Sequence, residues 1–254
     1  MLLPAASLLG LLFILLRLTG LLASSQVLGG QLVPWRVRIA LALAVSFLLA
    51  AVVPPVRVPD GVVMLLLAGA AEVLLGLAVG LTAALFFHGV RMAGQVAGIQ
   101  MGLGFSSLVD PASGDRTTVL ARLLGLAAWM VVLGCDGHLV LLRGLADSFS
   151  WLPPGSACGA LGRVVVGVPA AAGELFVTAV VVAAPALVVV LLLNVGMALL
   201  ARAAPQLHIL VIGFIITIVV GVSTVAFSLG GLAGQFRDGY LHMADMALSL
   251  CRPA

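Results

Sequence analysis

Charged residues are scarce in this sequence. Asp, Glu, Lys and Arg together make up 8% of the 254 residues, and every basic residue is arginine. A soluble domain is roughly 25% charged and about 45–50% apolar, whereas this chain is 63% hydrophobic. So few charges cannot cover a surface that faces water. The composition therefore predicts an integral membrane protein, with burial inside a hydrophobic assembly as the alternative.

Other absences limit the chemistry. Without lysine, Schiff-base and lysine general-base catalysis are excluded, and a net charge of +3 spread over the whole chain provides no basic patch for nucleic acid. Cys135, Cys158 and Cys251 lie too far apart for a metal or redox motif. The four histidines give no pair with ligand spacing, and no phosphate-binding loop is present. We predict no cofactor and no metal.

The nearest approach to a catalytic arrangement is Cys135, Asp136 and His138. On a helix, residues at i, i+1 and i+3 do not converge as a nucleophile, its base and an orienting acid must. We interpret them as a polar break in a helix, relaxed by Gly134 and Gly137. The chain is therefore predicted not to be an enzyme.

Long apolar runs fill most of the sequence. They cover residues 2–22, 39–53, 62–92, 119–145, 168–200 and 207–229. Runs of this length without period-2 alternation are helices, and helices satisfy their own backbone in lipid. We predict an all-α, polytopic membrane protein with about six long apolar helical regions, some overlong or broken, in a single domain over residues 1–254. The first run is interpreted as a retained helix, because its first positive charge, Arg17, lies inside the run.

Small residues recur at four-residue spacing in two places. Gly76 and Gly80 form one stripe, and Gly94 and Gly98 form another. Small residues one turn apart let helix backbones approach closely in membranes. The spacing leaves two readings open, which are packing within this chain and packing against other subunits.

Arg17, Glu72, His88 and Glu174 are ionisable residues within the apolar runs. A charge in lipid is costly and usually faces protein or a water-filled interior. We predict that these side chains are buried, and that Arg17, Glu72 and Glu174 are paired within an assembly. Glu72 and His88 are placed on the same four-residue row as the first glycine stripe.

One segment interrupts the apolar pattern, QMGLGFSSLVDPASGDRTTVLAR at 100–122. Irregular backbone at membrane depth is tolerated where it lines a cavity or is buried in protein. A transporter would pair such a break with another in the second half, and none is found there. We predict that Thr117 or Thr118 caps the next helix, and that this segment lines or blocks a conduit. Its candidate residues are Gly102, Gly104, Phe105, Ser106, Ser107, Leu108, Val109, Asp110 and Pro111.

Several stretches together resemble the FliR family of flagellar biosynthetic proteins. They are GIQMGLGFSSLVDPASG at 98–114, VLARLLGLAAWMVVLGCDGHLVLLRGLADSF at 119–149 followed by LPPG, VPWRVRIALALAVSFLLAAVVPP at 33–55, and LLLNVGMALLARAAPQLHILVIGFIITIVVG at 191–221. The resemblance runs from about residue 5 to 240. His208 departs from it, because the family has Asn there. The signature assigns Asn194, Arg202, Pro205 and Gln206 to packing and assembly.

The resemblance implies a subunit of the flagellar type III export gate. Such a subunit has a fold like FliP and FliQ joined in one chain, and it assembles with FliP, FliQ and other membrane proteins of the export apparatus. Segment 102–116 would be the pore plug, with residues 104–110 near the pore axis. Substrates would be unfolded flagellar proteins, driven outward by the proton motive force and a soluble ATPase. The implied location is the bacterial inner membrane, in the flagellar basal body.

Three alternatives are kept. A homologous injectisome gate subunit would be separated from a flagellar one by its neighbouring genes. A small-molecule transporter would act alone on a saturable substrate. A purely structural scaffold would tolerate substitutions in the 102–116 segment without loss of secretion.

Overall fold

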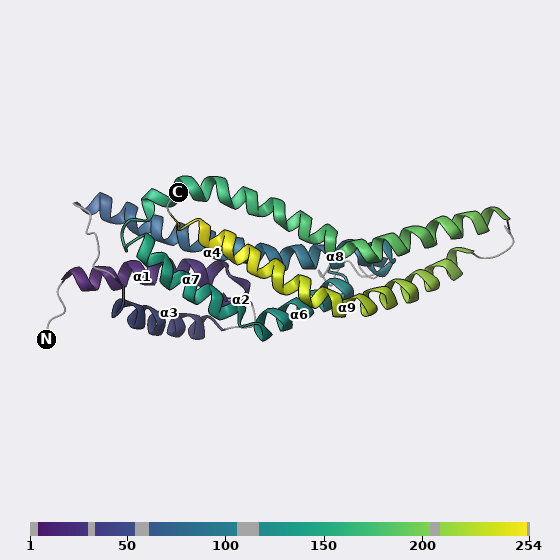
Figure 1. Cartoon of the computed structure of the whole chain (residues 1–254), viewed down its shortest axis with the longest axis horizontal. Coiled ribbons are helices and arrows are strands. Elements are labelled where there is room, and N and C mark those ends of the chain that lie inside the picture. Colours follow the sequence, from purple (N-terminus) through teal and green to yellow (C-terminus); the bar gives the residue numbers. More distant parts are fainter. Residues whose placement is uncertain (1–4, 30–33, 54–60, 106–116, 204–208, 253–254) are drawn as a thin grey trace. The chain divides into compact units, whose positions relative to one another are not determined.

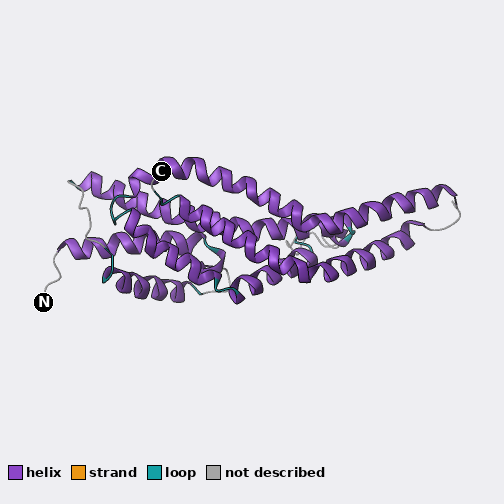
Figure 2. Ribbon diagram, viewed as in Figure 1, coloured by secondary structure: helices purple, strands orange, loops and turns teal. Residues whose placement is uncertain are grey.

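The chain is helical throughout the part that the structure describes (Figures 1 and 2). The computed structural model describes residues 5–29, 34–53, 61–105, 117–203 and 209–252, and these residues contain no strand. The elements are α1 (Ala5–Ser24), α2 (Gln26–Gly29), α3 (Trp35–Ala50), α4 (Val62–Gln100), η1 (Leu103–Phe105), α6 (Val119–Gly134), α7 (Gly137–Trp151), η3 (Ala157–Ala160), α8 (Leu161–Ala203) and α9 (Ile209–Ser249). The predicted all-α class is confirmed.

The helices form two compact units. The first contains Met1–Phe86, Val132–Glu174 and Gly239–Ala254, and the second contains Phe87–Val131 and Leu175–Asp238. Helices α4, α8 and α9 each contribute residues to both units. A single domain over residues 1–254 stays a prediction.

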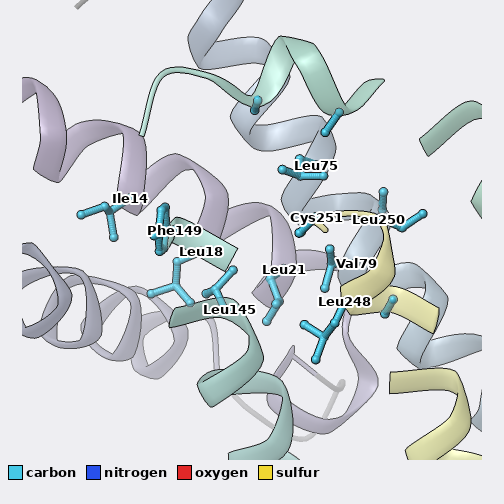
Figure 3. Packing of buried hydrophobic residues seen from close by; sticks show 14 of the residues in the cluster. Ile14, Leu18, Leu21, Leu75, Val79, Leu145, Phe149, Leu248, Leu250 and Cys251 are labelled. Carbon is cyan, nitrogen blue, oxygen red and sulfur yellow. The ribbon is translucent and has the colours of Figure 1, made fainter. Parts of the chain in front are cut away.

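The core of the first unit forms around α1. Ile14, Leu18 and Leu21 recur at helical spacing and are almost fully buried. They pack with Leu75 and Val79 of α4 and with side chains of α3, α7 and the end of α9, as Figure 3 shows for the central residues. Helix α1 therefore lies among its neighbours in this unit, although its composition alone would suit a lipid-facing helix.

The second unit is packed through small side chains. Ala93, Ala97, Ala121, Ala128 and Ala183 are buried, each at 3% exposure or less. Larger apolar side chains of this unit face outward, including Met130 on α6, Leu192 on α8 and Phe227 on α9. This unit therefore leaves a broad apolar surface that the chain itself does not cover.

Three helices of the described chain are long and apolar enough to cross a membrane, within Val62–Gln100, Ala157–Arg202 and Gly213–Ser249. A fourth span results if α6 and α7 together form one broken span. The polytopic membrane class is confirmed, although the expected number of about six long regions is too loose. Helix α3 has only 16 residues, fewer than the ~20 that a span needs.

Helix α9 runs further than its apolar stretch predicted. It continues through the more polar tail to Ser249. Leu232, Phe236, Tyr240, Ala244 and Leu248 recur every fourth residue in this tail and are buried. Polar residues between these buried positions lower the mean hydropathy of the tail without interrupting the helix.

The predicted break near 134–138 is confirmed, since α6 ends at Gly134 and α7 begins at Gly137. Asp136 has a left-handed backbone (φ 54°), and α6 and α7 meet at a bend of 61°. Gly137 lies against Tyr240, whose hydroxyl donates a hydrogen bond to the Gly137 carbonyl oxygen at 3.0 Å. Asp136 and Cys135 are exposed and His138 is half-buried. The break is therefore a packed turn.

Candidate functional site

The first glycine stripe forms a contact between the backbones of α1 and α4, which we call the α1 seam. A Cβ added to Gly76 would overlap the carbonyl oxygen of Arg17, and one added to Gly80 would lie 2.6 Å from the Leu21 carbonyl oxygen. From the other side, a Cβ on Gly20 would overlap the Val73 carbonyl oxygen. The glycines of this stripe thus pack within the chain, which is one of the two readings that the sequence left open.

The α1 seam carries a buried ion pair. Arg17 and Glu72 have no exposed side-chain surface, and Arg17 Nε donates to Glu72 Oε2 at 2.6 Å. The partners come from α1 and α4, so this pair is internal to the chain, whereas the sequence suggested pairing within an assembly. Close approach of the two backbones at Gly76 places the two side chains within reach of each other.

His88 and Glu174 differ from the predicted burial within this chain. His88 is exposed and Glu174 is half-buried. The four-residue row drifts by about 40° per step around an α-helix, because four residues turn through about 400°. Four steps carry His88 about 160° away from Glu72, onto a different face of α4. The shared spacing therefore does not make a shared face over this length.

The second glycine stripe lies against the start of α6, a contact that we call the α6 seam. A Cβ on Gly94 would lie 2.5 Å from the Ala121 Cα, which is backbone. A Cβ on Gly98 would lie 2.7 Å from Thr118 Oγ1, which is a side chain. This stripe also packs within the chain, at the end of α4 that precedes the irregular segment.

Thr118 fixes the point at which the chain returns from that segment. Its hydroxyl accepts a hydrogen bond from the Ala121 N–H at 3.3 Å, so Thr118 caps α6, as predicted for this position or its neighbour. The same hydroxyl donates to the Gly94 carbonyl oxygen at 3.2 Å. The Thr118 N–H donates to Gln95 Oε1 at 2.8 Å. The start of α6 is thereby tied to the last turns of α4.

The residues that follow the end of α4, where the segment begins, pack against α9. Gly102 has a left-handed backbone (φ 84°), and a Cβ there would overlap the Phe214 ring. Met101 is buried, and its side chain fills the space that a Cβ on Gly221 would need. Phe214 and Gly221 lie seven residues apart, or about two helical turns. One end of the segment is thus held by contacts with α9 and the other by contacts with α4.

The remaining predicted residues are less constrained or lie outside the described chain. Gly104 is half-buried, whereas Asn194 and Arg202 are exposed on α8. Residues 106–116, Pro205, Gln206 and the side chain of Phe105 lie outside what the structure describes. The plug residues Ser106, Ser107, Leu108, Val109, Asp110 and Pro111 therefore stay predictions. Within the described ranges, no group of three or more His, Cys, Asp or Glu side chains could hold a metal ion.

Several contact residues were missed from the sequence. Met101 and Gly221 meet across more than one hundred residues of chain, and Ser148 reaches Arg17 across a separation of 131. No spacing rule connects positions so far apart. The LPPG motif at 152–155 offered a turn signal, but nothing in it indicated that Gly155 would donate to Glu72.

Comparison with known proteins places these features in a family. The chain matches the family described as "Bacterial export proteins, family 1" over residues 8–243. It is 37% identical to the flagellar biosynthetic protein FliR of Escherichia coli (strain K12) over 212 residues, which cover 84% of this chain and 81% of that relative. FliR of Pectobacterium carotovorum subsp. carotovorum is 34% identical over 217 residues (84% and 81%). FliR of Caulobacter vibrioides is 28% identical over 221 residues (86% and 88%).

The fold and the long apolar helices define an all-α, multi-pass membrane protein. The chain belongs to the FliR family of bacterial export proteins, as its sequence motifs predicted. It is thus a flagellar biosynthesis and protein export component. The relatives are export proteins by name rather than enzymes, which fits the interpretation of Cys135, Asp136 and His138 as a turn.

Proposed function

We propose that this chain is a gate subunit of the flagellar type III export apparatus in the bacterial inner membrane. It assembles with FliP and FliQ homologues, and with other membrane proteins of the apparatus, into a pore for unfolded flagellar proteins. Segment 102–116 is its plug. The relatives named above are all flagellar, which favours a flagellar role over the homologous injectisome role.

The lengths of the helices support a protein assembly. Helices α4, α8 and α9 have 39, 43 and 41 residues. At ~1.5 Å per residue each is about 60 Å long, roughly twice the ~30 Å hydrocarbon core of a bilayer. Half of each helix therefore has to be covered by something other than lipid tails. Other subunits with similar long helices would provide that cover.

The uncovered apolar surface supports the same proposal. In the most apolar windows of these three helices, 39%, 28% and 22% of residues are buried within the chain. A self-sufficient transporter would bury more of its helices against one another around its own substrate site. An assembly subunit leaves them exposed until its partners bind.

The observation that carries the plug assignment is the anchoring of both ends of the segment. Thr118 is bonded to Gly94 and Gln95 on one side, and Met101 and Gly102 pack on α9 on the other. The described chain thus leaves and returns beside the same end of α4. A loop with fixed ends and an apolar sequence at Phe105, Leu108 and Val109 suits a plug.

Assembly is tested by co-expressing this chain, tagged, with the FliP and FliQ homologues of the same genome. After extraction in mild detergent, native mass spectrometry should show one discrete complex that contains a single copy of this chain. A chain that purifies alone and well behaved would contradict the assembly and favour a transporter.

The plug is tested by ion leak through the assembled complex. Deleting residues 104–110 should leave the complex assembled but make the membrane leaky to small ions. A second pair of variants keeps the length of the segment and gives a sharper test. Replacing Phe105, Leu108 and Val109 by Ser should cause the leak, and replacing Ser106, Ser107 and Asp110 by Ala should not. If the leak is unchanged in the first variant while the complex is intact, the plug assignment is wrong.

A further inference from the structure

The Arg17–Glu72 pair makes more contacts than an ion pair needs. Besides Glu72 Oε2, the Arg17 guanidinium donates from Nη1 to Ser148 Oγ at 3.0 Å and from Nη2 to the Leu152 carbonyl oxygen at 3.1 Å. It also lies 4.2 Å from the centre of the Phe149 ring. The second carboxylate oxygen, Glu72 Oε1, accepts from the Gly155 N–H at 2.8 Å. The pair thus joins α1, α4, α7 and the turn that follows α7.

Two of these bonds go to the backbone of that turn, residues 152–155. Pro153 and Pro154 have no N–H, and Gly155 has a left-handed backbone (φ 88°). The polar groups at the two ends of the turn, the Leu152 carbonyl and the Gly155 N–H, are partly buried. Arg17 satisfies the first and Glu72 satisfies the second. Each member of the pair therefore holds one end of the same turn.

The turn leads directly into α8. Element η3 begins two residues after Gly155, and its Ala157 and Ala160 are fully buried in the core of this unit. Helix α8 begins at Leu161. Any shift of the turn would move these two alanines and the first residue of α8 with them. What holds the turn therefore sets where α8 starts in the first unit.

Net stability does not explain such a pair. Removing two charges from water costs several kcal/mol per ion, and an apolar pair of similar volume is often as stable. A buried pair is better suited to specify one arrangement, because alternative packings would leave a charge without a partner. The planar guanidinium fork can reach three acceptors in fixed directions, which a point charge cannot.

We propose that Arg17 and Glu72 are positioning residues, which hold the 152–155 turn and thereby set the start of α8 against α1 and α4. The role is independent of the plug, because it lies in the first unit and uses no residue of the 102–116 segment. The proposal predicts that a variant can keep its charges, or its stability, while the turn at 152–155 no longer holds its position.

The three native cysteines report on this position. Cys158 lies in η3, three residues after Gly155, and is exposed. Cys251 is buried in the same core, beside Leu250 and near Leu75 and Val79 (Figure 3). Burial raises the pKa of the Cys251 thiol, so the reactive thiolate is scarce as well as shielded. Cys135, in the α6–α7 turn, is exposed and serves as the internal reference.

The experiment measures the rate at which a maleimide labels each cysteine in the full chain, in membranes, by mass spectrometry. Arg17→Lys keeps the charge but loses the fork. The double variant Arg17→Met with Glu72→Leu removes both charges and leaves no uncompensated ion. In each variant that accumulates, Cys251 should be labelled at least about tenfold faster than in the unaltered chain. The loss of one buried hydrogen bond raises the population of molecules with an accessible Cys251 by about that factor. The Cys158 rate should change as well, while the Cys135 rate should not.

The matched control is Arg143→Gln, which removes an exposed arginine from the same helix as Ser148. It should leave all three labelling rates unchanged. If Arg17→Lys or the double variant accumulates and labels like the unaltered chain, the turn does not need the pair and the proposal is overturned. It is also overturned if neither variant accumulates, because the pair then serves stability alone. Assembly with the FliP and FliQ homologues is scored separately, so failure of the proposed gate role would not alter these rates.

Discussion

The two glycine seams of α4 have the same spacing but meet different neighbours. Along the α1 seam, Gly76 and Gly80 both face carbonyl oxygens of another backbone, with a buried ion pair beside them. Along the α6 seam, Gly94 faces backbone but Gly98 faces the Thr118 side chain. A backbone moves only with its whole helix, whereas a side chain can rotate. The contacts of α4 are therefore rigid in the first unit and adjustable where the irregular segment begins.

The largest expected difference in stability is between a buried and an exposed ion pair that each lose their carboxylate. Glu72→Gln leaves the Arg17 guanidinium buried without a counter-charge, and breaking a buried pair in this way costs about 3–5 kcal/mol. Asp245→Asn makes the same chemical change in the exposed pair with Arg252, where the N–O distance is 3.2 Å and the side chains are 49% and 66% exposed. Solvent screening limits that cost to under ~1 kcal/mol. Thermal unfolding of the purified complex with the FliP and FliQ homologues measures both losses of stability, and similar losses in the two variants would contradict the comparison.

The second-largest expected loss of stability tests the contact between the backbones of α1 and α4 alone. Gly76→Ala places a methyl group against the Arg17 carbonyl oxygen, so α1 and α4 must separate. Overpacking of this kind costs about 1–3 kcal/mol. The control is Gly173→Ala in α8, where nothing lies within 4 Å of the added Cβ. Alanine favours a helix over glycine by up to ~1 kcal/mol, so the control should be neutral or stabilising. If Gly76→Ala unfolds at the same temperature as the control, the α1 seam is not tight.

A smaller effect is expected at the cap of the α6 seam. Thr118→Ala removes the hydroxyl that accepts from the Ala121 N–H and donates to the Gly94 carbonyl oxygen. Loss of such a cap typically costs ~1 kcal/mol. Thr118→Ser keeps the hydroxyl and should retain most of the stability. Hydrogen exchange of the first turn of α6 should rise in the alanine variant alone, and equal protection in both variants would mean that the hydroxyl does not cap the helix.

Local pattern was enough to predict much of this fold. The apolar runs indicated the helices, the glycines indicated where backbones approach, and GCDGH indicated the break between α6 and α7. Pairing could not be predicted in the same way. The sequence did not say which group pairs with Glu72, and only the fold brings Arg17 and Gly155 to Glu72 and Ser148 to Arg17.

The exposure of His88 within this chain shows the limit of a periodic pattern. A four-residue row is a good guide over two turns, as for Glu72 and Gly76, but its drift of about 40° per step accumulates. The residues of the proposed plug were hard to place from the sequence for a different reason. Their sequence indicated a turn-rich break, and the ends of that break were found at Gly102 and Thr118, positions set by contacts with α9 and α4 that no local signal contains.

The smallest expected change in stability is at Gly98, and it tests whether the α6 seam is adjustable. In Gly98→Ala the added Cβ meets Thr118 Oγ1 at 2.7 Å and Thr118 Cβ at 2.9 Å. Rotation of the hydroxyl relieves the first contact at the cost of its bond to the Gly94 carbonyl oxygen, and a shift of a few tenths of an ångström relieves the second. That loss of about 0.5–1.5 kcal/mol is nearly offset by the gain in helix propensity, up to ~1 kcal/mol. Gly94→Ala meets the Ala121 Cα at 2.5 Å and has no such escape, so it should unfold at a clearly lower temperature. Equal losses of stability in the two variants would show that the α6 seam is as rigid at Thr118 as at Ala121. The start of α6 would then be held by backbone contacts rather than by the Thr118 hydroxyl.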